Sequence, residues 1–294
     1  MFKGVYCALI TPFKKGQIDF DALDLLIERQ TAAGLEGFVL LGTTAETPAL
    51  SFEEKKQILD FAVAKINKRA KIIIGAGSNN TQTTLKNIEL AKTYNPDGLL
   101  IVTPYYNKPN LSGMIQHFSL AAQANIPIVL YHIPGRTGQK LPPAFLSALL
   151  EAVPMIKAVK ESDYDIAGIT KTAVQHGQKR MGYICGNDDL WPVFLGLGAR
   201  CLITAAGNSI APAMVKIYKL FEQGKTQDAM QVFRTAYPLI NGSFLEVNPT
   251  CPKYILAKLG LCSDEVRLPL GQISQSTKET LDNLINKAPK ELFI

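Results

Sequence analysis

Short apolar runs alternate along the chain with longer amphipathic segments. Eight runs have the length and composition of buried strands: residues 4–11, 37–42, 71–77, 98–104, 127–132, 156–162, 180–186 and 199–206. Most are almost continuously apolar, which is typical of parallel strands covered on both faces of a sheet. The pattern therefore predicts a parallel sheet.

The segments between these runs have the spacing of amphipathic helices. Residues 21–34 place one stripe on Leu23, Leu26, Ile27 and Gln30. Residues 51–66 open with Ser51 and Glu54 at the spacing of a capping box. The stripe predicted for this second segment is Ile58, Phe61, Ala62 and Lys65. Both segments are predicted to form helices that turn one face toward a core.

The alternation predicts the fold class. Eight strand–helix units within about 220 residues are typical of a (β/α)8 TIM barrel, and residues 1–224 are assigned to it as the catalytic domain. Three further helix-like segments follow no strand, so residues 225–294 are predicted to be a C-terminal helical domain. The alternative is an open doubly wound sheet, which is expected to have a glycine-rich turn after its first strand. Residues 10–16 do not form such a turn.

Composition and charge narrow the class of protein. The chain has 294 residues, of which 47% are hydrophobic, so it can bury a large core, and no apolar stretch has the length of a membrane span. The first residues lack a secretory cleavage pattern, so a cytoplasmic protein that does not bind membranes is expected. The net charge of +6 is spread along the chain, which leaves no dense basic patch for nucleic acid.

Cysteine and histidine usage argues against a metal centre. The five cysteines include no C-x-x-C pair, and the three histidines are far apart in the sequence. This disfavours a disulfide framework, a zinc site and a histidine-rich metal site, and it fits buried thiols in a reducing compartment.

One charged residue interrupts an apolar strand. Ile156, Ala158 and Lys160 fall on the same side of a period-two pattern. An edge strand, or a lysine whose stem lies on apolar surface while its head reaches water, would explain this without any function. In a (β/α)8 barrel, however, active sites lie at the carboxyl ends of the strands, and Lys160 stands at such an end.

Other polar side chains follow the ends of predicted strands: Thr43, Thr44, Tyr105, Tyr106, Tyr131 and Arg136. Each has an ordinary structural explanation as a turn cap, a rim aromatic or a surface ion pair. Their convergence on one rim with a lysine indicates a catalytic site.

This set of residues supports a specific carbonyl chemistry. A neutral lysine amine can attack a ketone and form a Schiff base, and burial among apolar side chains disfavours the charged form of an amine. The protonated imine withdraws electrons and gives an enamine that can attack an aldehyde. Threonine and tyrosine hydroxyls can pass protons, and arginine or backbone N–H groups can hold anionic substrates.

The chain resembles the dihydrodipicolinate synthase family, within the larger N-acetylneuraminate lyase group of pyruvate-dependent aldolases. The motifs that carry the resemblance run nearly end to end: LITPF, GTTAET, GAGSNN, VTPYYNKP, YHIPGRTG, VKES, CGNDD, ITAAGN, NPTCPK and VRLPL. Their order along the chain makes the resemblance specific. It implies a lyase that condenses pyruvate with L-aspartate 4-semialdehyde to 4-hydroxy-tetrahydrodipicolinate, in lysine and diaminopimelate biosynthesis.

The resemblance also implies the catalytic residues. Lys160 would form the Schiff base with pyruvate, so no cofactor and no metal are expected. Thr43, Tyr106 and Tyr131 would form the proton relay. In the family, Tyr106 reaches across a dimer interface into the neighbouring site, and two dimers make a tetramer, so a homotetramer is expected.

The same resemblance implies the substrate-binding residues. Thr44 would hold the pyruvate carboxylate through its backbone, and Arg136 would hold the carboxylate of the semialdehyde. Gly186 and Ile203 match backbone positions that line the pocket.

Several positions depart from the family pattern. Ala45, Thr47 and His132 stand where glycine, serine and asparagine are more frequent, and Asn187 lies in a CGNDD motif that is one residue longer than usual. These departures leave open an N-acetylneuraminate or 2-keto-3-deoxy-sugar-acid lyase with the same lysine chemistry. Arg136 favours the semialdehyde, because sugar-acid relatives generally lack an arginine there. A non-catalytic binding protein on this scaffold is a further alternative, which the four catalytic positions disfavour.

Inhibition by lysine is expected to be weak or absent. In lysine-sensitive relatives the effector pocket uses two histidines, a glutamate, an asparagine and a tyrosine. Phe52, Lys55 and Thr83 stand at the first three of these positions, whereas Asn79 and Tyr105 are retained. Lys55 adds a positive charge near the ligand's ammonium group and Thr83 removes the carboxylate that would pair with it.

Overall fold

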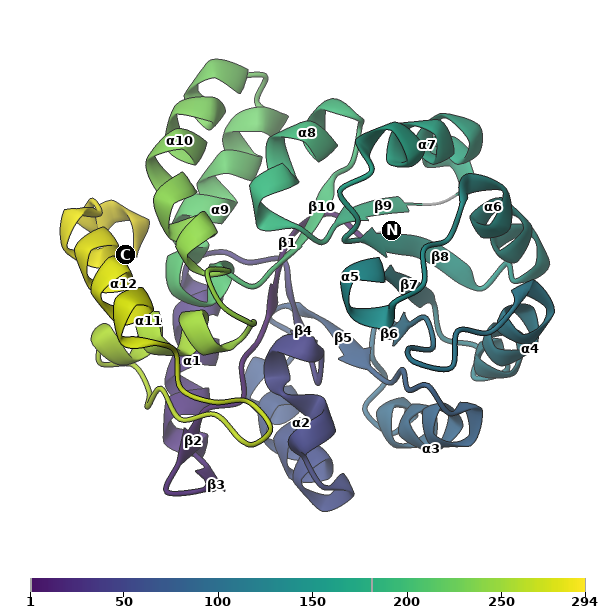
Figure 1. The fold of residues 1–294 in the computed structure, drawn as a ribbon, viewed down its shortest axis with the longest axis horizontal. Coiled ribbons are helices and arrows are strands. Elements are labelled where there is room, and N and C mark those ends of the chain that lie inside the picture. Colours follow the sequence, from purple (N-terminus) through teal and green to yellow (C-terminus); the bar gives the residue numbers. More distant parts are fainter. Residues whose placement is uncertain (1, 181, 294) are drawn as a thin grey trace. The chain divides into compact units, whose positions relative to one another are not determined.

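The strands form a closed, parallel, eight-stranded barrel in the order β1-β10-β9-β8-β7-β6-β5-β4 (Figure 1). The computed structural model describes residues 2–180 and 182–293, without the side chains of 177–180. The barrel strands are β1 (Gly4–Ala8), β4 (Gly37–Leu40), β5 (Lys71–Gly75), β6 (Gly98–Val102), β7 (Ile128–His132), β8 (Ile156–Glu161), β9 (Gly182–Cys185) and β10 (Cys201–Thr204). Each lies within one of the eight predicted runs, so the predicted (β/α)8 class is confirmed.

The chain divides into two compact units. The first unit is Met1–Lys3 with Ile72–Ile203, and the second is Gly4–Lys71 with Thr204–Ile294. The predicted division into a barrel domain of residues 1–224 and a helical domain of residues 225–294 stays a prediction.

In the first unit, consecutive helices pack side by side around the strands. They are α3 (Thr81–Lys92), α4 (Leu111–Ala122), α6 (Pro143–Ala152) and α7 (Ile166–Arg180), and each contacts the next (Figure 1). Asn80 and Asn110 cap the first two by accepting from the backbone N–H groups of Thr83 and Gly113. The loops that follow β5 and β6 therefore end at these two asparagines.

The register between β7 and β8 contains an irregularity. Ile128 is the partner of Ile156, but the next residue, Val129, is the partner of Ala158, so Lys157 is passed over. From there the pairing is regular, with Tyr131 opposite Lys160 and His132 opposite Glu161 at its end. One extra residue in β8 thus decides which side chains face each other at the carboxyl ends of the two strands.

The second unit places β1 beside β4 and covers them with helices. α1 (Phe20–Ala32) buries the predicted stripe, and α2 (Phe52–Ile66) begins with the predicted capping box between Ser51 and Glu54. The stripe predicted for α2 is partly wrong. Leu59 and Ile66 are buried, whereas Phe61 and Lys65 are half-buried, because they lie at the border with α1, where the Phe61 ring meets Phe20 at 5.1 Å and Lys65 pairs with Asp24.

A two-stranded hairpin precedes α1 and was not predicted. It joins β2 (Phe13–Lys14) to β3 (Gln17–Ile18), and both turn residues, Lys15 and Gly16, have positive φ. The strands are two residues long, too short to give an alternating sequence pattern.

The C-terminal part of the second unit is helical, as predicted. α9 (Gly207–Glu222) packs on α10 (Thr226–Gly242), and α11 (Thr250–Lys258) packs on α12 (Gln275–Lys287). A separate apolar cluster joins the last two helices: Cys251, Tyr254, Ile255, Ile273 and Leu281. Cys7, Cys185, Cys201 and Cys251 are buried, as expected. Within the described residues, no helix combines the length and apolarity that crossing a membrane requires.

Candidate active site

Lys160 is the last but one residue of β8, and its side chain lies over an aromatic ring. The residue is only 7% exposed, and Nζ lies 4.0 Å from the centroid of the Tyr131 ring at the end of β7. A buried amine that faces a π-surface is shielded from water, while its charged form keeps a favourable partner. The structure thus brings together the two residues that sequence reasoning placed first.

Gly186 directly follows β9 and makes room for this lysine. A Cβ atom at this position would lie 2.1 Å from Ser162 Oγ, 2.7 Å from the Glu161 carbonyl oxygen and 3.1 Å from Lys160 Cε. The Gly186 N–H donates to the Glu161 carbonyl oxygen at 2.8 Å. The close approach of two backbones beside the lysine stem therefore requires glycine here. Ile203 lies in β10, next to β9, and is buried.

Cys185, immediately before Gly186, does not compete as a nucleophile. Burial raises the pKa of its thiol well above the usual value, and its Sγ donates to the Asn187 carbonyl oxygen at 3.1 Å. The thiol is held in its protonated, unreactive form.

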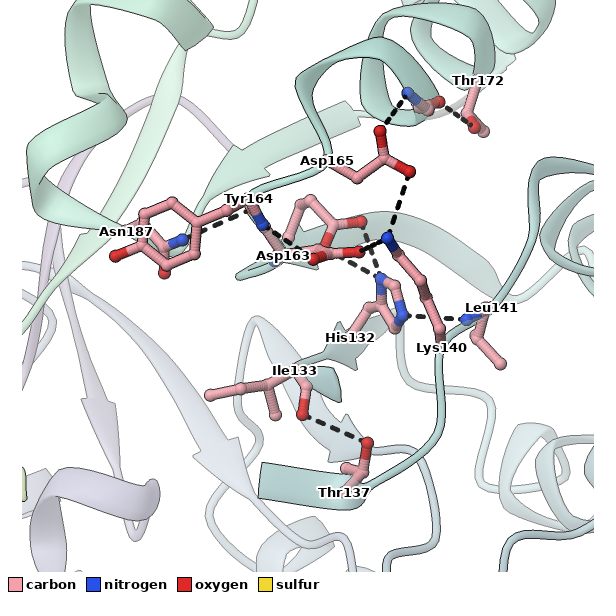
Figure 2. Close-up of polar contacts among 12 residues, drawn as sticks. His132, Ile133, Thr137, Lys140, Leu141, Asp163, Tyr164, Asp165, Thr172 and Asn187 are labelled. Carbon is pink, nitrogen blue, oxygen red and sulfur yellow. Dashed lines mark hydrogen bonds and ion pairs between the residues drawn. The ribbon is translucent and has the colours of Figure 1, made fainter. Parts of the chain in front are cut away.

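Arg136 lies on a single helical turn after β7. This turn, α5 (Pro134–Thr137), ends at Gly138 with φ of 69°, and the Arg136 side chain is exposed. The Thr137 hydroxyl donates to the Ile133 carbonyl oxygen at 3.1 Å, which closes the turn (Figure 2). A guanidinium is the side chain that matches the geometry of a carboxylate, and this one lies at a strand end.

Tyr106 differs from the other predicted residues because its side chain is 89% exposed in the single chain. It follows β6 and has φ of 71°, in the left-handed region that an aromatic residue seldom adopts. Its neighbour Tyr105 is half-buried. The loop therefore directs the Tyr106 side chain toward solvent in the single chain.

Thr43 and Thr44 lie in the second unit, on a tight turn after β4. The turn is a 3-10 helix, η1 (Thr43–Ala45), which ends at Glu46 with φ of 55°. The Thr11 hydroxyl donates to the Ala45 carbonyl oxygen at 2.9 Å, and the Thr47 hydroxyl donates to the Gly42 carbonyl oxygen at 2.8 Å. The turn is fixed on both sides, so its backbone N–H groups keep one direction.

The C-terminal segments of the second unit hold the same turn. Asn248 Nδ2 donates to Thr44 Oγ at 2.9 Å, and the buried Glu46 carboxylate forms an ion pair with Lys253. The Lys253 ammonium also lies 4.1 Å from the Phe13 ring centroid. Burial lowers the pKa of Lys253, and the facing Glu46 carboxylate opposes that shift. These contacts join segments that are about two hundred residues apart in the sequence.

Sequence reasoning missed a second pair at the ends of β7 and β8. His132 is the register partner of Glu161, and its Nδ1 lies 2.9 Å from both carboxylate oxygens. Both residues are 3% exposed. The sequence could have indicated this pair, because a histidine directly follows Tyr131 and a glutamate directly follows Lys160. Their contact depends on the irregular register, which the sequence does not reveal.

No group of three or more histidine, cysteine, aspartate or glutamate side chains suited to a metal ion occurs among the residues that the structure describes. The polar groups of the site are amine, hydroxyl and guanidinium groups, whereas the His132 imidazole lies on the other face of the strands. Together they can perform nucleophilic attack on a carbonyl, proton transfer and anion binding.

Comparisons with known proteins agree with this chemistry. The dihydrodipicolinate synthetase family matches residues 1–288. The 4-hydroxy-tetrahydrodipicolinate synthase of Endomicrobium trichonymphae is 36% identical over 286 residues, which cover 97% of this chain and 98% of the relative.

Two solved structures have the same fold. The 4-hydroxy-tetrahydrodipicolinate synthase of Methylacidiphilum fumariolicum SolV has a TM-score of 0.95 at 33% identity and covers 99% of this chain and 97% of its own. The chloride-inhibited dihydrodipicolinate synthase of Acinetobacter baumannii, complexed with pyruvate, has a TM-score of 0.94 at 31% identity and covers 100% of both chains.

The fold and the lysine at its strand ends define a lyase built on a (β/α)8 barrel. The chain belongs to the dihydrodipicolinate synthetase family. This family uses a lysine Schiff base with pyruvate, and its substrates are pyruvate and aspartate semialdehyde.

Proposed function

We propose that the chain condenses pyruvate with L-aspartate 4-semialdehyde to 4-hydroxy-tetrahydrodipicolinate through a Schiff base on Lys160. The observation that supports this most directly is the buried Lys160 amine beside the Tyr131 ring, with Gly186 leaving room at its stem. Family membership over nearly the whole chain supports the same reaction.

In the proposed reaction, the neutral Lys160 amine attacks the keto carbon of pyruvate, and the carbinolamine loses water to give a protonated imine. Loss of a methyl proton gives the enamine, whose carbon attacks the aldehyde carbon of the semialdehyde. The amino group of the semialdehyde then displaces the lysine, which closes the ring and frees Lys160. Tyr131, Thr43 and Tyr106 pass the protons in these steps.

The remaining residues of the site bind the two anionic substrates. The backbone of Thr44 holds the pyruvate carboxylate, and Arg136 holds the carboxylate of the semialdehyde. Gly186 and Ile203 contribute backbone to the pocket wall. The covalent lysine adduct activates pyruvate by itself, so the reaction needs neither a metal nor another cofactor.

The proposed function includes an oligomer in which one subunit completes the active site of another. Tyr106 is exposed in the single chain, which supports a role in the site of a partner subunit within a homotetramer made of two dimers. Mixing Lys160→Ala with Tyr106→Phe subunits tests it, because a hybrid dimer would contain one site with both residues intact. Recovery of activity on mixing is expected, and no recovery would place Tyr106 in its own subunit's site. A cytoplasmic enzyme that binds no nucleic acid and no membrane is proposed with it.

Covalent trapping tests the central step. Pyruvate with borohydride should label the protein once per chain, and peptide mapping should place the adduct on Lys160. Lys160→Ala should abolish the label, whereas Lys157→Ala, which removes the neighbouring lysine of β8, should retain it. An adduct on another lysine would refute the mechanism. Turnover with the semialdehyde beside sugar aldehydes then identifies the acceptor.

A further inference from the structure

The imidazole of His132 stands between two segments that leave neighbouring strands. On one side its Nδ1 faces both oxygens of the buried Glu161 carboxylate. On the other side its Nε2 accepts from the Leu141 N–H at 3.1 Å (Figure 2). Because a backbone N–H can only donate, Nε2 carries no proton and the proton of the neutral ring is on Nδ1.

The bond to Leu141 closes the segment that carries Arg136. Residues 133–140 leave β7 and return to its last residue, His132, through the Leu141 N–H. Within the segment, α5 is a single turn of four residues and is followed by Gly138 at positive φ. One helical turn has little stability of its own. The direction of Arg136 therefore depends on how the two ends of the segment are held, together with the hydrogen bond from Gln139 Nε2 to the Pro109 carbonyl oxygen at 2.8 Å.

The bond to Glu161 extends this tie to β8. Glu161 directly follows Lys160, and its Oε1 also accepts from the Asp163 N–H at 2.8 Å. Since side chains alternate along a strand, the His132–Glu161 pair lies on the opposite face of the two strands from Tyr131 and Lys160. The pair therefore acts behind the reacting groups, without touching them.

A second, weaker contact follows the same route. Lys140, at the end of the Arg136 segment, lies 3.2 Å from one carboxylate oxygen of Asp163 and 3.2 Å from one of Asp165 (Figure 2). The Lys140 side chain is 53% exposed, so these ion pairs contribute little compared with the buried pair.

We propose that His132 is a positioning residue that, as the neutral Nδ1-protonated imidazole, ties the Arg136 segment to the strand end carrying Lys160 and so sets how well the aldehyde substrate is held. This inference rests on the proposed function, in which Arg136 binds the carboxylate of the aldehyde. It means that a residue that touches neither substrate affects how well the enzyme binds the aldehyde.

Kinetics separate positioning from general damage. His132→Phe keeps a flat ring and removes both nitrogens, so kcat/KM for the semialdehyde should fall at least about tenfold, the effect of losing one hydrogen bond to a charged group. The loss should appear mainly as a higher KM for the semialdehyde, with the rate of pyruvate labelling within about twofold of wild type. His132→Asn keeps one donor and one acceptor and should recover part of the loss.

A double-mutant cycle decides whether His132 acts through Arg136. If it does, adding His132→Phe to Arg136→Ala should cost little beyond Arg136→Ala alone, because the positioned group is already missing. Losses that multiply would overturn the inference. His176→Phe is the matched control, since His176 is also buried but bonds to Ser147 on α6, and it should leave kcat/KM unchanged.

Nitrogen-15 NMR of the histidine side chains tests the inference in the wild-type protein, so it does not depend on whether a variant folds. The chain has three histidines, so the ring signals can be assigned with few substitutions. His132 should show a protonated Nδ1 and an unprotonated Nε2 at neutral pH, and a proton on Nε2 would overturn the inference even if His132→Phe does not fold. Absence of pyruvate labelling in the wild type would instead refute the proposed function.

Discussion

Lys160 and Tyr131 are register partners on neighbouring parallel strands, and the lysine ammonium nitrogen lies 4.0 Å from the centre of the tyrosine ring. The ring shields one side of the amine from water, and the same residue carries a hydroxyl group that could pass protons. This arrangement allows packing and proton transfer by the same tyrosine to be separated experimentally.

Tyr131→Phe keeps the ring and removes only the hydroxyl. If the hydroxyl passes protons, kcat should fall about 10²-fold to 10⁴-fold, the usual contribution of a positioned acid or base, while thermal unfolding changes little. Steady-state kinetics and a melting curve check this. Tyr237→Phe, which removes a hydroxyl from a 44% exposed tyrosine on α10, is the control. A kcat within threefold of wild type would remove Tyr131 from the relay.

Arg136→Ala should leave labelling by pyruvate largely intact and impair use of the semialdehyde. A charge-assisted contact contributes about 1.5–3 kcal/mol, so kcat/KM for the semialdehyde should fall at least about tenfold. Arg69→Ala removes another guanidinium, which binds Glu28 on the surface, and should have no such effect. Unchanged kinetic constants for the semialdehyde in Arg136→Ala would contradict the assigned role.

Gly186→Ala should impair the lysine directly. The added Cβ would meet Ser162 Oγ at 2.1 Å and the Glu161 carbonyl oxygen at 2.7 Å, so the end of β8 or the Gly186 backbone must move. The rate of borohydride trapping should fall at least about tenfold, because a displaced nucleophile loses its approach geometry. Gly196→Ala, where nothing lies within 4 Å of the added atom, should trap at the wild-type rate.

Acid should weaken the ion pair between Glu54 on α2 and Arg267, which lies between α11 and α12. Hydrogen bonds from Arg267 lower the pKa of Glu54 to about 2. A carboxyl group whose pKa is lowered on folding adds stability above its unfolded value, near 4.5, and that stability is lost as the pH falls toward 2. Denaturant unfolding should therefore show Glu54→Gln less stable than wild type at pH 7, with the difference shrinking between pH 4.5 and 2.

The neighbouring substitution Glu53→Gln is the control for this pH dependence. It removes a carboxylate from the same helical turn and leaves the Glu54–Arg267 pair in place. Its stability difference from wild type should stay nearly constant over the same pH range. A Glu54→Gln difference that stays constant would mean that the ion pair adds no stability.

L-Lysine should inhibit weakly or not at all. At the positions that the family resemblance assigns to the effector pocket, Lys55 is half-buried and burial lowers the pKa of its ammonium group, and Thr83 carries no carboxylate. Initial rates with L-lysine up to tens of millimolar check this, because a ~1 mM site would be saturated there. Thr83→Glu should increase the sensitivity. Strong inhibition of the wild type below 1 mM would contradict the prediction.

Much of the fold follows from local patterns in the sequence. The continuous apolar runs predicted all eight barrel strands, because a strand buried on both faces leaves no polar positions. Lys160 could be found by the same logic, since it breaks such a run at a carboxyl end.

Contacts that depend on register could not be found in this way. Regular pairing from Ile128 and Ile156 would place Val159 opposite Tyr131. Because Lys157 has no partner on β7, the register shifts by one residue and Lys160 lies opposite Tyr131 instead. The His132–Glu161 pair depends on the same irregularity. The close approach at Gly186 is likewise a property of two neighbouring backbones, which no single stretch of sequence encodes.

Two residues that bind the turn after β4 are synthesised long after the turn itself. Thr44 and Asn248, which binds its hydroxyl, are 204 positions apart, and Glu46 and the Arg267 backbone are 221 apart. At about 5–20 residues per second, a ribosome that has finished this turn works on the order of ten to forty seconds more before either partner has been synthesised. A nascent chain that has not yet reached Asn248 therefore holds this turn through its local contacts alone and lacks both of these later partners.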